Sequence, residues 1–289
     1  MQKIIYVPPA GDINRPETCV EFSLTPPYII GSVSGTGGAD TTVISSTVPG
    51  VDGVFVQGIR TESRQITCFL HVKGDTRAQM YEERFRLAAM LAPAREPGTL
   101  YYFNDFRCLR IGAIPTSSPS FTDRFQNYNR AELTFLCPFP HWESLSESAG
   151  YMAYLDEGFE FPFEFDVSFA ALENQTRMHN LGSVASPVQI LIQGPATNPA
   201  VVNGTTGEFI RLAAILEKGE SIFISTKRGA KEVTIRHQDG SEEDGYHYID
   251  PQSTFFQMAP GENHLRYESD NETEQTQVKI TYRELYAGV

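Results

Sequence analysis

The chain has 289 residues and a formal net charge of −13, with 36 Asp and Glu against 23 Lys and Arg. Because phosphate recognition needs a basic surface, this balance argues against a protein that clamps nucleic acid. The length suits two domains of ordinary size, and 19 Phe and 13 Tyr with few long helical patterns favour β structure. No apolar run approaches a membrane span, and the amino terminus lacks the apolar core of a secretion signal, so we expect folding in a cytoplasm.

The first half is predicted to be rich in strands, with one helix near its middle. Residues 1–6 are typical of a first strand, and residues 65–72 alternate like a half-buried strand. Between them, residues 31–53 form a long Gly/Ser/Thr segment without a core-facing period. We expect this segment either to be a plain surface loop or to be mobile alone and ordered by a neighbouring molecule, and we favour the second interpretation.

A helix is expected after residue 74, with Asp75 or Thr76 as its N-cap and Pro93 beyond its end. Its apolar residues recur at helical spacing and comprise Met80, Tyr81, Phe85, Leu87, Ala88 and Leu91. Such a stripe is more often buried core than contact surface. Strands over residues 100–103 and 106–111 should follow, joined by a tight turn at Asn104-Asp105.

The second half is predicted to be almost wholly β. Residues 144–161 are polar or acidic and should connect the two domains, and residues 161–169 should enter the second domain. Short strands separated by Gly, Asn and Asp turns then favour a β-sandwich of jelly-roll type. The expected strands cover residues 188–193, 200–203, 209–216, 221–225, 233–236, 246–249, 253–256, 263–267 and 277–282.

The chain carries no pattern that identifies an enzyme, a metal site or a cofactor site. The six histidines are scattered, and Cys19, Cys68, Cys108 and Cys137 are far apart and should be buried free thiols. The acidic residues 239–245 lack the spaced ligands of a calcium loop and should form a solvated hairpin tip. Carboxylates are numerous, and no pair is singled out for glycoside hydrolysis. We therefore assign no catalytic, cofactor-binding or metal-binding residue and predict a protein that is not an enzyme.

Several motifs of the first half occur in the order of a known family. After the strand and helix come Pro97-Gly98-Thr99-Leu100-Tyr101-Tyr102, Pro119-Ser120-Phe121 and Leu136-Cys137-Pro138-Phe139-Pro140-His141-Trp142-Glu143. This order resembles the distal tail proteins of long-tailed, non-contractile bacteriophages (siphophages). In the second half, Pro260-Gly261-Glu262-Asn263 before an alternating strand is similar to the second domain of that family.

The resemblance implies two mainly β domains. Residues 1–143 would form a ring-forming domain related to tail-tube proteins, a β-sandwich or split barrel with one α-helix. Residues 144–289 would form a galectin-like jelly-roll β-sandwich, with residues 144–161 as the connection.

The resemblance also implies a structural role in the virion, as a baseplate hub at a phage or prophage tail tip. Six copies would close into a ring that joins the tail tube protein to the tail-tip protein and, in some relatives, to receptor-binding proteins. DNA would pass through the lumen without specific binding, and no cofactor or membrane is expected. Residues 31–53 are expected at inter-subunit contacts and the helix over 75–91 in ring support, with the loops 239–245 and 270–274 as peripheral surfaces.

Two alternatives stay open. The first is a carbohydrate-binding adhesion module acting through the C-terminal sandwich, with Trp142, Tyr246 and Tyr248 as the aromatic residues considered for stacking on a sugar ring. Trp142 lies in a motif that is expected to be structural, and the two tyrosines are typical of cross-strand pairs. The second alternative is a cell-wall hydrolase subunit, which the absence of a catalytic pattern opposes.

Overall fold

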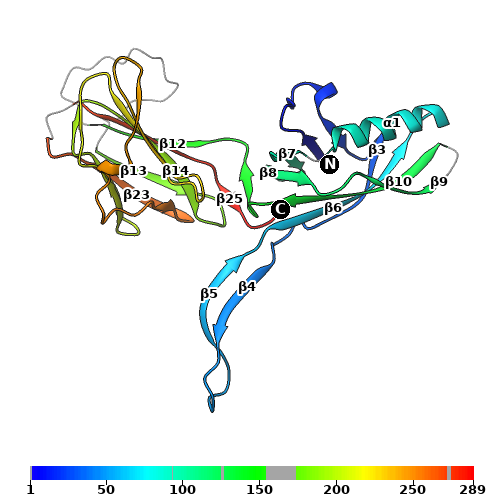
Figure 1. Ribbon diagram of the computed structural model, residues 1–289, viewed down its shortest axis with the longest axis horizontal. Helices are drawn as coiled ribbons and strands as arrows, with labels where there is room; N and C mark the ends of the chain where they lie inside the picture. Colours follow the sequence, from blue (N-terminus) through cyan, green and yellow to red (C-terminus); the bar gives the residue numbers. More distant parts are fainter. Residues whose placement is uncertain (1, 93, 125–126, 154–173, 272–274) are drawn as a thin grey trace. The chain divides into compact units, whose positions relative to one another are not determined.

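The computed structural model describes residues 2–92, 94–124, 127–153, 174–271 and 275–289. The chain divides into two compact units, Met1–Leu145 with Tyr286–Val289, and Ser146–Leu285. Both units are built mainly from strands, and the α-helix of the described residues is α1 (Arg77–Met90) (Figure 1). The predicted mainly-β class with one α-helix is confirmed for this part of the chain.

The first unit is an antiparallel sheet that curls towards closure. Its main path runs β2-β1-β7-β8-β10-β6-β3, with β9 paired to β10 and β11 to β8. The two ends of the path meet where the Ser23 amide donates to the Tyr28 carbonyl (3.1 Å) and the Ile30 amide donates to the Ser23 carbonyl (2.7 Å). This arrangement is the predicted split barrel. Its strands are β1 (Lys3–Val7), β2 (Val20–Phe22), β3 (Tyr28–Ser34), β6 (Arg64–Lys73), β7 (Gly98–Phe103), β8 (Cys108–Pro115), β9 (Ser120–Arg124), β10 (Tyr128–Cys137), β11 (Trp142–Ser144) and β25 (Leu285–Tyr286).

One face of this sheet is buried, and α1 covers part of it. β6 alternates along its whole length because its even-numbered apolar side chains enter the core and the odd-numbered ones point away. The helix begins after Thr76, whose hydroxyl accepts a hydrogen bond from the Gln79 amide at 3.2 Å. Of the two expected N-caps, the structure therefore selects Thr76.

The apolar stripe expected on α1 is wider than the buried one. Met80, Leu87 and Leu91 are buried as predicted, whereas Phe85 is 79% exposed and Tyr81 is 39% exposed. The prediction that these two aromatic residues belong to the buried face is wrong, because they lie beyond the narrow line along which the helix meets β6 and β10.

A second correction concerns the turn after β7. The Asn104 side chain accepts from the amides of Phe106 (2.8 Å) and Arg107 (2.6 Å), so the turn extends further and β8 begins at Cys108. Cys108 is consequently exposed, unlike the other three cysteines, and the expectation of four buried thiols is wrong at this position. Burial raises the pKa of the Cys68 and Cys137 thiols to about 12.

Residues 31–53 contain more β-strand than the sequence indicates. β3 continues to Ser34, and β4 (Thr41–Ser46) pairs with β5 (Phe55–Thr61) in a separate two-stranded sheet. This hairpin projects away from β3 and β6 (Figure 1). The interpretation as a plain surface loop is wrong for the two paired strands, because a ribbon that buries neither face shows no alternation of apolar and polar residues. The favoured interpretation, order supplied by a neighbouring molecule, stays a prediction.

The second unit is a β-sandwich, as predicted. One sheet has the order β12-β24-β14-β19-β20-β21, with β22 on β14, and the other has the order β13-β23-β16-β17. A single core fills the space between them, with Ile190, Ile222 and Tyr267 among its fully buried members. The strands are β12 (Ser148–Ala153), β13 (Gln175–Asn180), β14 (Ser186–Gln193), β15 (Ala196–Thr197), β16 (Ala200–Asn203), β17 (Glu208–Arg211), β18 (Ile215–Leu216), β19 (Ser221–Ser225), β20 (Glu232–Arg236), β21 (Glu242–Asp244), β22 (Gln257–Met258), β23 (Gly261–Glu268) and β24 (Gln277–Tyr282).

Several local predictions in this unit need correction. Residues 148–153, expected in the connection, form β12, and the strand expected over 209–216 is divided into β17 and β18. Residues 253–256 form no strand. The Asp244 carboxylate accepts from the Tyr246 amide at 3.0 Å and starts the 3₁₀ turn Tyr246–Tyr248 in place of the strand expected there. Residues 161–169, which were expected to enter the second domain, lie outside the described residues.

Candidate assembly surfaces

The hairpin β4–β5 is the largest exposed apolar feature of the first unit. Ile59 is 70% exposed and Phe55 is 56% exposed. The other large apolar side chains exposed on it are Val43, Ile44, Val48, Val51, Val54 and Val56. Two glycines with positive φ, Gly50 and Gly53, allow its tip to turn.

This hairpin buries little of its own apolar surface. Its two strands pair only with each other in the described sheets, with a register shift between Ile44 and Ser45. A two-stranded ribbon is marginally stable in water, and contiguous exposed apolar surface marks an interaction site. We call this hairpin, β4–β5, the arm, and its exposed apolar surface makes it a candidate contact surface.

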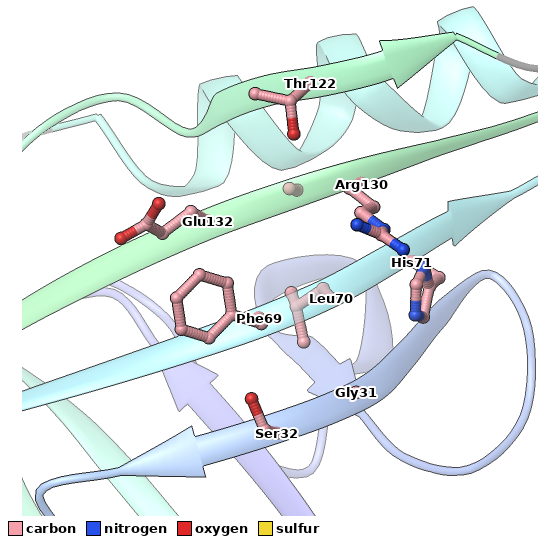
Figure 2. Close-up of a pocket in the computed structure, with 9 residues that line it drawn as sticks. Gly31, Ser32, Phe69, Leu70, His71, Thr122, Arg130 and Glu132 are labelled. Carbon is pink, nitrogen blue, oxygen red and sulfur yellow. The ribbon is translucent and has the colours of Figure 1, made fainter.

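A second surface lies on the face of the first sheet that points away from the core. Figure 2 shows an open hollow across β3, β6, β10 and β9, with the side chains of Phe69, Arg130 and Glu132 standing on it. Its volume is about 410 Å³, and Phe69, its apolar centre, is 46% exposed. The lining residues are Gly31, Ser32, Phe69, Leu70, His71, Thr122, Arg130, Ala131 and Glu132.

The hollow owes its shape to a bulge in β3. The pairing of β3 with β6 shifts register between Ile30 and Ser32, and Gly31 occupies the shift. A Cβ atom at Gly31 would lie 3.2 Å from the Phe69 carbonyl oxygen, so a larger residue would press on β6. The missing side chain at Gly31 thus lets β3 approach the backbone of β6 at Phe69.

The outward face of α1 combines aromatic and basic side chains. The guanidinium groups of Arg77 and Arg84 lie 5.8 Å and 5.3 Å from the centre of the Tyr81 ring, and Arg84 also lies 4.2 Å from the centre of the Phe121 ring. Phe85 follows Tyr81 by four residues on the same side of the helix and is also exposed. This face exposes aromatic and basic side chains, and the ring support expected of the helix stays a prediction.

The second unit carries the acidic loop that the sequence singles out. Glu242–Asp244 belongs to β21, so the hairpin tip is shorter than residues 239–245. His237 lies between two carboxylates, with Nδ1 at 2.8 Å from Glu220 and Nε2 at 3.2 Å from Glu243. Hydrogen bonds that the ring donates to these carboxylates raise the pKa of His237. The expected loop 270–274 lies partly outside the described residues.

The aromatic residues considered for sugar stacking are not presented together. Trp142 is fully buried in the first unit, so it is unable to stack on a sugar. Tyr246 is 42% exposed but stacks on Phe255, with the ring centres 5.9 Å apart, and the Tyr248 hydroxyl donates to Glu243 at 3.4 Å. The structural role expected of Trp142 is confirmed.

Two further observations bear on function. In the part of the chain that the structure describes, no group of three or more His, Cys, Asp or Glu side chains is placed to hold a metal ion. No helix among the described residues is long and apolar enough to cross a membrane.

The sequence reasoning missed the apolar residues of the arm and the hollow beside Phe69. A signal for the arm was present, since Thr41-Thr42-Val43-Ile44 and Val54-Phe55-Val56 are rich in β-branched and aromatic residues. The hollow had no comparable signal, because it depends on the register shift at Gly31.

Comparison with known proteins supports the resemblance on both units. Residues 18–137 match a family model described as phage tail protein RIFT-related domain, and residues 181–286 match one described as siphovirus-type tail component, C-terminal domain. The two ranges together cover most of the chain. No curated protein sequence matches it.

Two solved structures share the fold. The crystal structure of SPP1 Dit (gp 19.1), whose title calls it a paradigm of hub adsorption apparatus in Gram-positive infecting phages, has a TM-score of 0.68 at 14% identity over 99% of each chain. A chain of the phage P2 baseplate in its activated conformation with Ca has a TM-score of 0.51 at 13% identity over 97% of each chain. With a siphophage tail-protein model matched on each unit, the chain belongs to the siphophage distal tail protein family.

Proposed function

We propose that this chain is a non-enzymatic structural hub of a siphophage tail tip, and that six copies close into a ring. The observation that carries the proposal is the apolar arm β4–β5, which extends from the sheet with its large side chains exposed. Family membership supports the same role. The arm supplies what an assembling subunit needs, namely an apolar surface that is costly to leave in water.

The ring contact pairs two different surfaces of the chain. The arm, with Phe55 and Ile59, is one surface, and the hollow around Phe69 is the other. When a surface binds a different surface on the next copy, the contact is heterologous and a constant rotation closes it into a ring. We propose that the arm of one copy covers the hollow of its neighbour, burying Phe69.

The hub would connect the tail tube protein to the tail-tip protein and, in some assemblies, to a receptor-binding protein. The formal net charge of −13 supports passage of DNA through the lumen, because an acidic wall repels phosphate. The protein would be made in the cytoplasm of the bacterial host and incorporated into the virion. The second unit would act as a separate peripheral domain, with the loops at 239–245 and 270–274 as its contact surfaces.

Molar mass by light scattering across a concentration series tests the proposal, with negative-stain images of the largest species. A ring of six chains would have about 193 kDa, six times the 32.2 kDa of one chain, and the images would show a hollow six-fold particle. A strict monomer at every concentration, with no ring in the images, would contradict a self-assembling hub.

A further inference from the structure

Arg64 is a buried arginine at the root of the arm. It opens β6, three residues after β5 ends at Thr61, and is only 2% exposed. Its guanidinium group lies 5.9 Å from the centre of the Trp142 ring. A buried cation is costly unless its donors are satisfied, so the partners of Arg64 indicate what the residue holds together.

The partners are backbone carbonyl oxygens in the bend before β4, between β10 and β11, and after β25. Nη1 donates to Gly35 (3.1 Å), Thr36 (3.0 Å) and Gly37 (2.5 Å), in the bend that leads into β4. Nε donates to Pro140 at 2.9 Å, and Nη2 donates to Ala287. One planar group thus joins three segments that are distant in the sequence.

The last residues of the chain also touch the bend directly. The Val289 amide donates to the Thr36 carbonyl at 3.1 Å. Gly288 lies so close to Gly37 that an added Cβ would come within 2.8 Å of its backbone. Just before them, the Tyr286 ring is buried in the first core, and Arg107 lies 4.3 Å from its centre.

These contacts are important because they attach the arm to the sheet only at its root, where β4 begins and β5 ends. β4 and β5 form a sheet of their own within the described chain, and the root is further closed by the Glu62 amide, which donates to the Asp40 carbonyl at 2.8 Å. A small rotation at the bend would be magnified along the ribbon. A closed ring requires the same rotation between every pair of neighbouring copies. An arm that makes the contact must therefore point in one fixed direction.

We infer that Arg64 is the positioning residue of the arm, and that it makes the arm's direction depend on Ala287, Gly288 and Val289. The inference rests on the proposed ring function and adds the regulation of that same surface by the end of the chain. Lysine cannot reproduce the arrangement, because one ammonium group does not span carbonyl oxygens in three segments.

The distance between the arm and the sheet tests this inference in the chain of residues 1–289. In a Cys108→Ser background, spin labels are placed by Asp52→Cys at the tip and Lys73→Cys at the end of β6, and the distance distribution is measured in dilute monomer. We expect deletion of Gly288 and Val289 to broaden the distribution, and Arg64→Lys to broaden it further. Arg60→Lys, at an exposed ion pair with Glu62 (3.4 Å), is the matched control and should leave it unchanged.

Ring formation by unlabelled variants gives the second readout. Variants with a broadened distribution should lose the hexamer while keeping the circular dichroism spectrum of the parent. If Arg64→Lys does not fold, the deletion alone decides, since it leaves the guanidinium group in place. An unchanged distribution in the deletion variant would overturn the inference, as would a broadened arm that still assembles fully.

The distance readout separates the two proposals. If the parent chain forms no ring, the proposed function fails, yet the monomer measurement still reports whether Arg64 and the final residues fix the arm. If the parent forms rings and the deletion variant forms them equally well, the inference fails and the proposed function stands.

Discussion

The arm β4–β5 and the β-sandwich of the second unit are both made of antiparallel strands, yet they differ in what they bury. The strands β14 and β19 place Ile190, Ile192 and Ile222 in a shared core, and each alternates accordingly. The arm places its Val, Ile and Phe side chains in solvent. The described strands of the sandwich therefore bury their apolar side chains within one chain, whereas those of the arm stay exposed and, in the proposed ring, would be covered by a neighbouring copy.

Core truncation should produce the largest effect and would show how strongly the first unit depends on buried faces. Leu100→Ala removes a fully buried side chain from β7, so we expect the free energy of unfolding to fall by about 2–5 kcal/mol. Trp142 is the only tryptophan, so its fluorescence in urea reports this unit. Ile59→Ala on the arm is the matched truncation and should change stability by less than about 0.5 kcal/mol. Equal losses at both positions would contradict the contrast between arm and core.

A smaller effect is expected at the start of α1, the element that covers the buried face. Thr76→Ala leaves the Gln79 amide without its capping oxygen and should cost about 1 kcal/mol. Thr76→Ser keeps the hydroxyl and should restore most of the loss. Urea unfolding followed by Trp142 fluorescence measures both, and an unaffected Thr76→Ala variant would show that the cap is not needed.

The sandwich should respond to pH through His237. Its pKa is raised above the ordinary 6.5 by hydrogen bonds to Glu220 and Glu243, so the protonated form stabilises the folded state. That stabilisation is complete below the ordinary pKa and is lost as the pH rises through the folded pKa. We expect His237→Gln to flatten the change in stability between about pH 6 and about pH 8, as measured by circular dichroism. An unchanged pH dependence in the variant would contradict the assignment.

The sequence predicted best where a strand or helix buries one face. In three such elements the apolar residues repeat with the period that burial of one face requires, and the structure has all three. They are the strand over 188–193, the strand over 277–282 and the capped helix after Thr76. The split barrel came from the family resemblance, whereas the β-sandwich was also favoured by the short strands and turns of the second half. Without that resemblance, the strand pattern would have supported β structure but not the function.

The other features could not be predicted from the sequence, for physical reasons that the structure identifies. The arm has no buried face and hence no period, and the turn at Asn104 and the 3₁₀ turn after Asp244 depend on single side-chain hydrogen bonds. The Phe69 hollow and the Arg64 cluster join segments that are distant in the sequence. A single sequence does not indicate which distant segments come into tertiary contact.

The most direct test of the central claim is the molar mass of a variant with a polar arm, measured beside the parent by light scattering. Phe55→Ser with Ile59→Ser should leave the Trp142 unfolding transition nearly unchanged but reduce the species of about 193 kDa, six chains of 32.2 kDa, to monomer. Phe106→Ser, which alters an aromatic side chain that is 81% exposed outside the arm, should still form the ring. A hexamer that persists in the arm variant at the parent's concentration would contradict assembly through β4–β5.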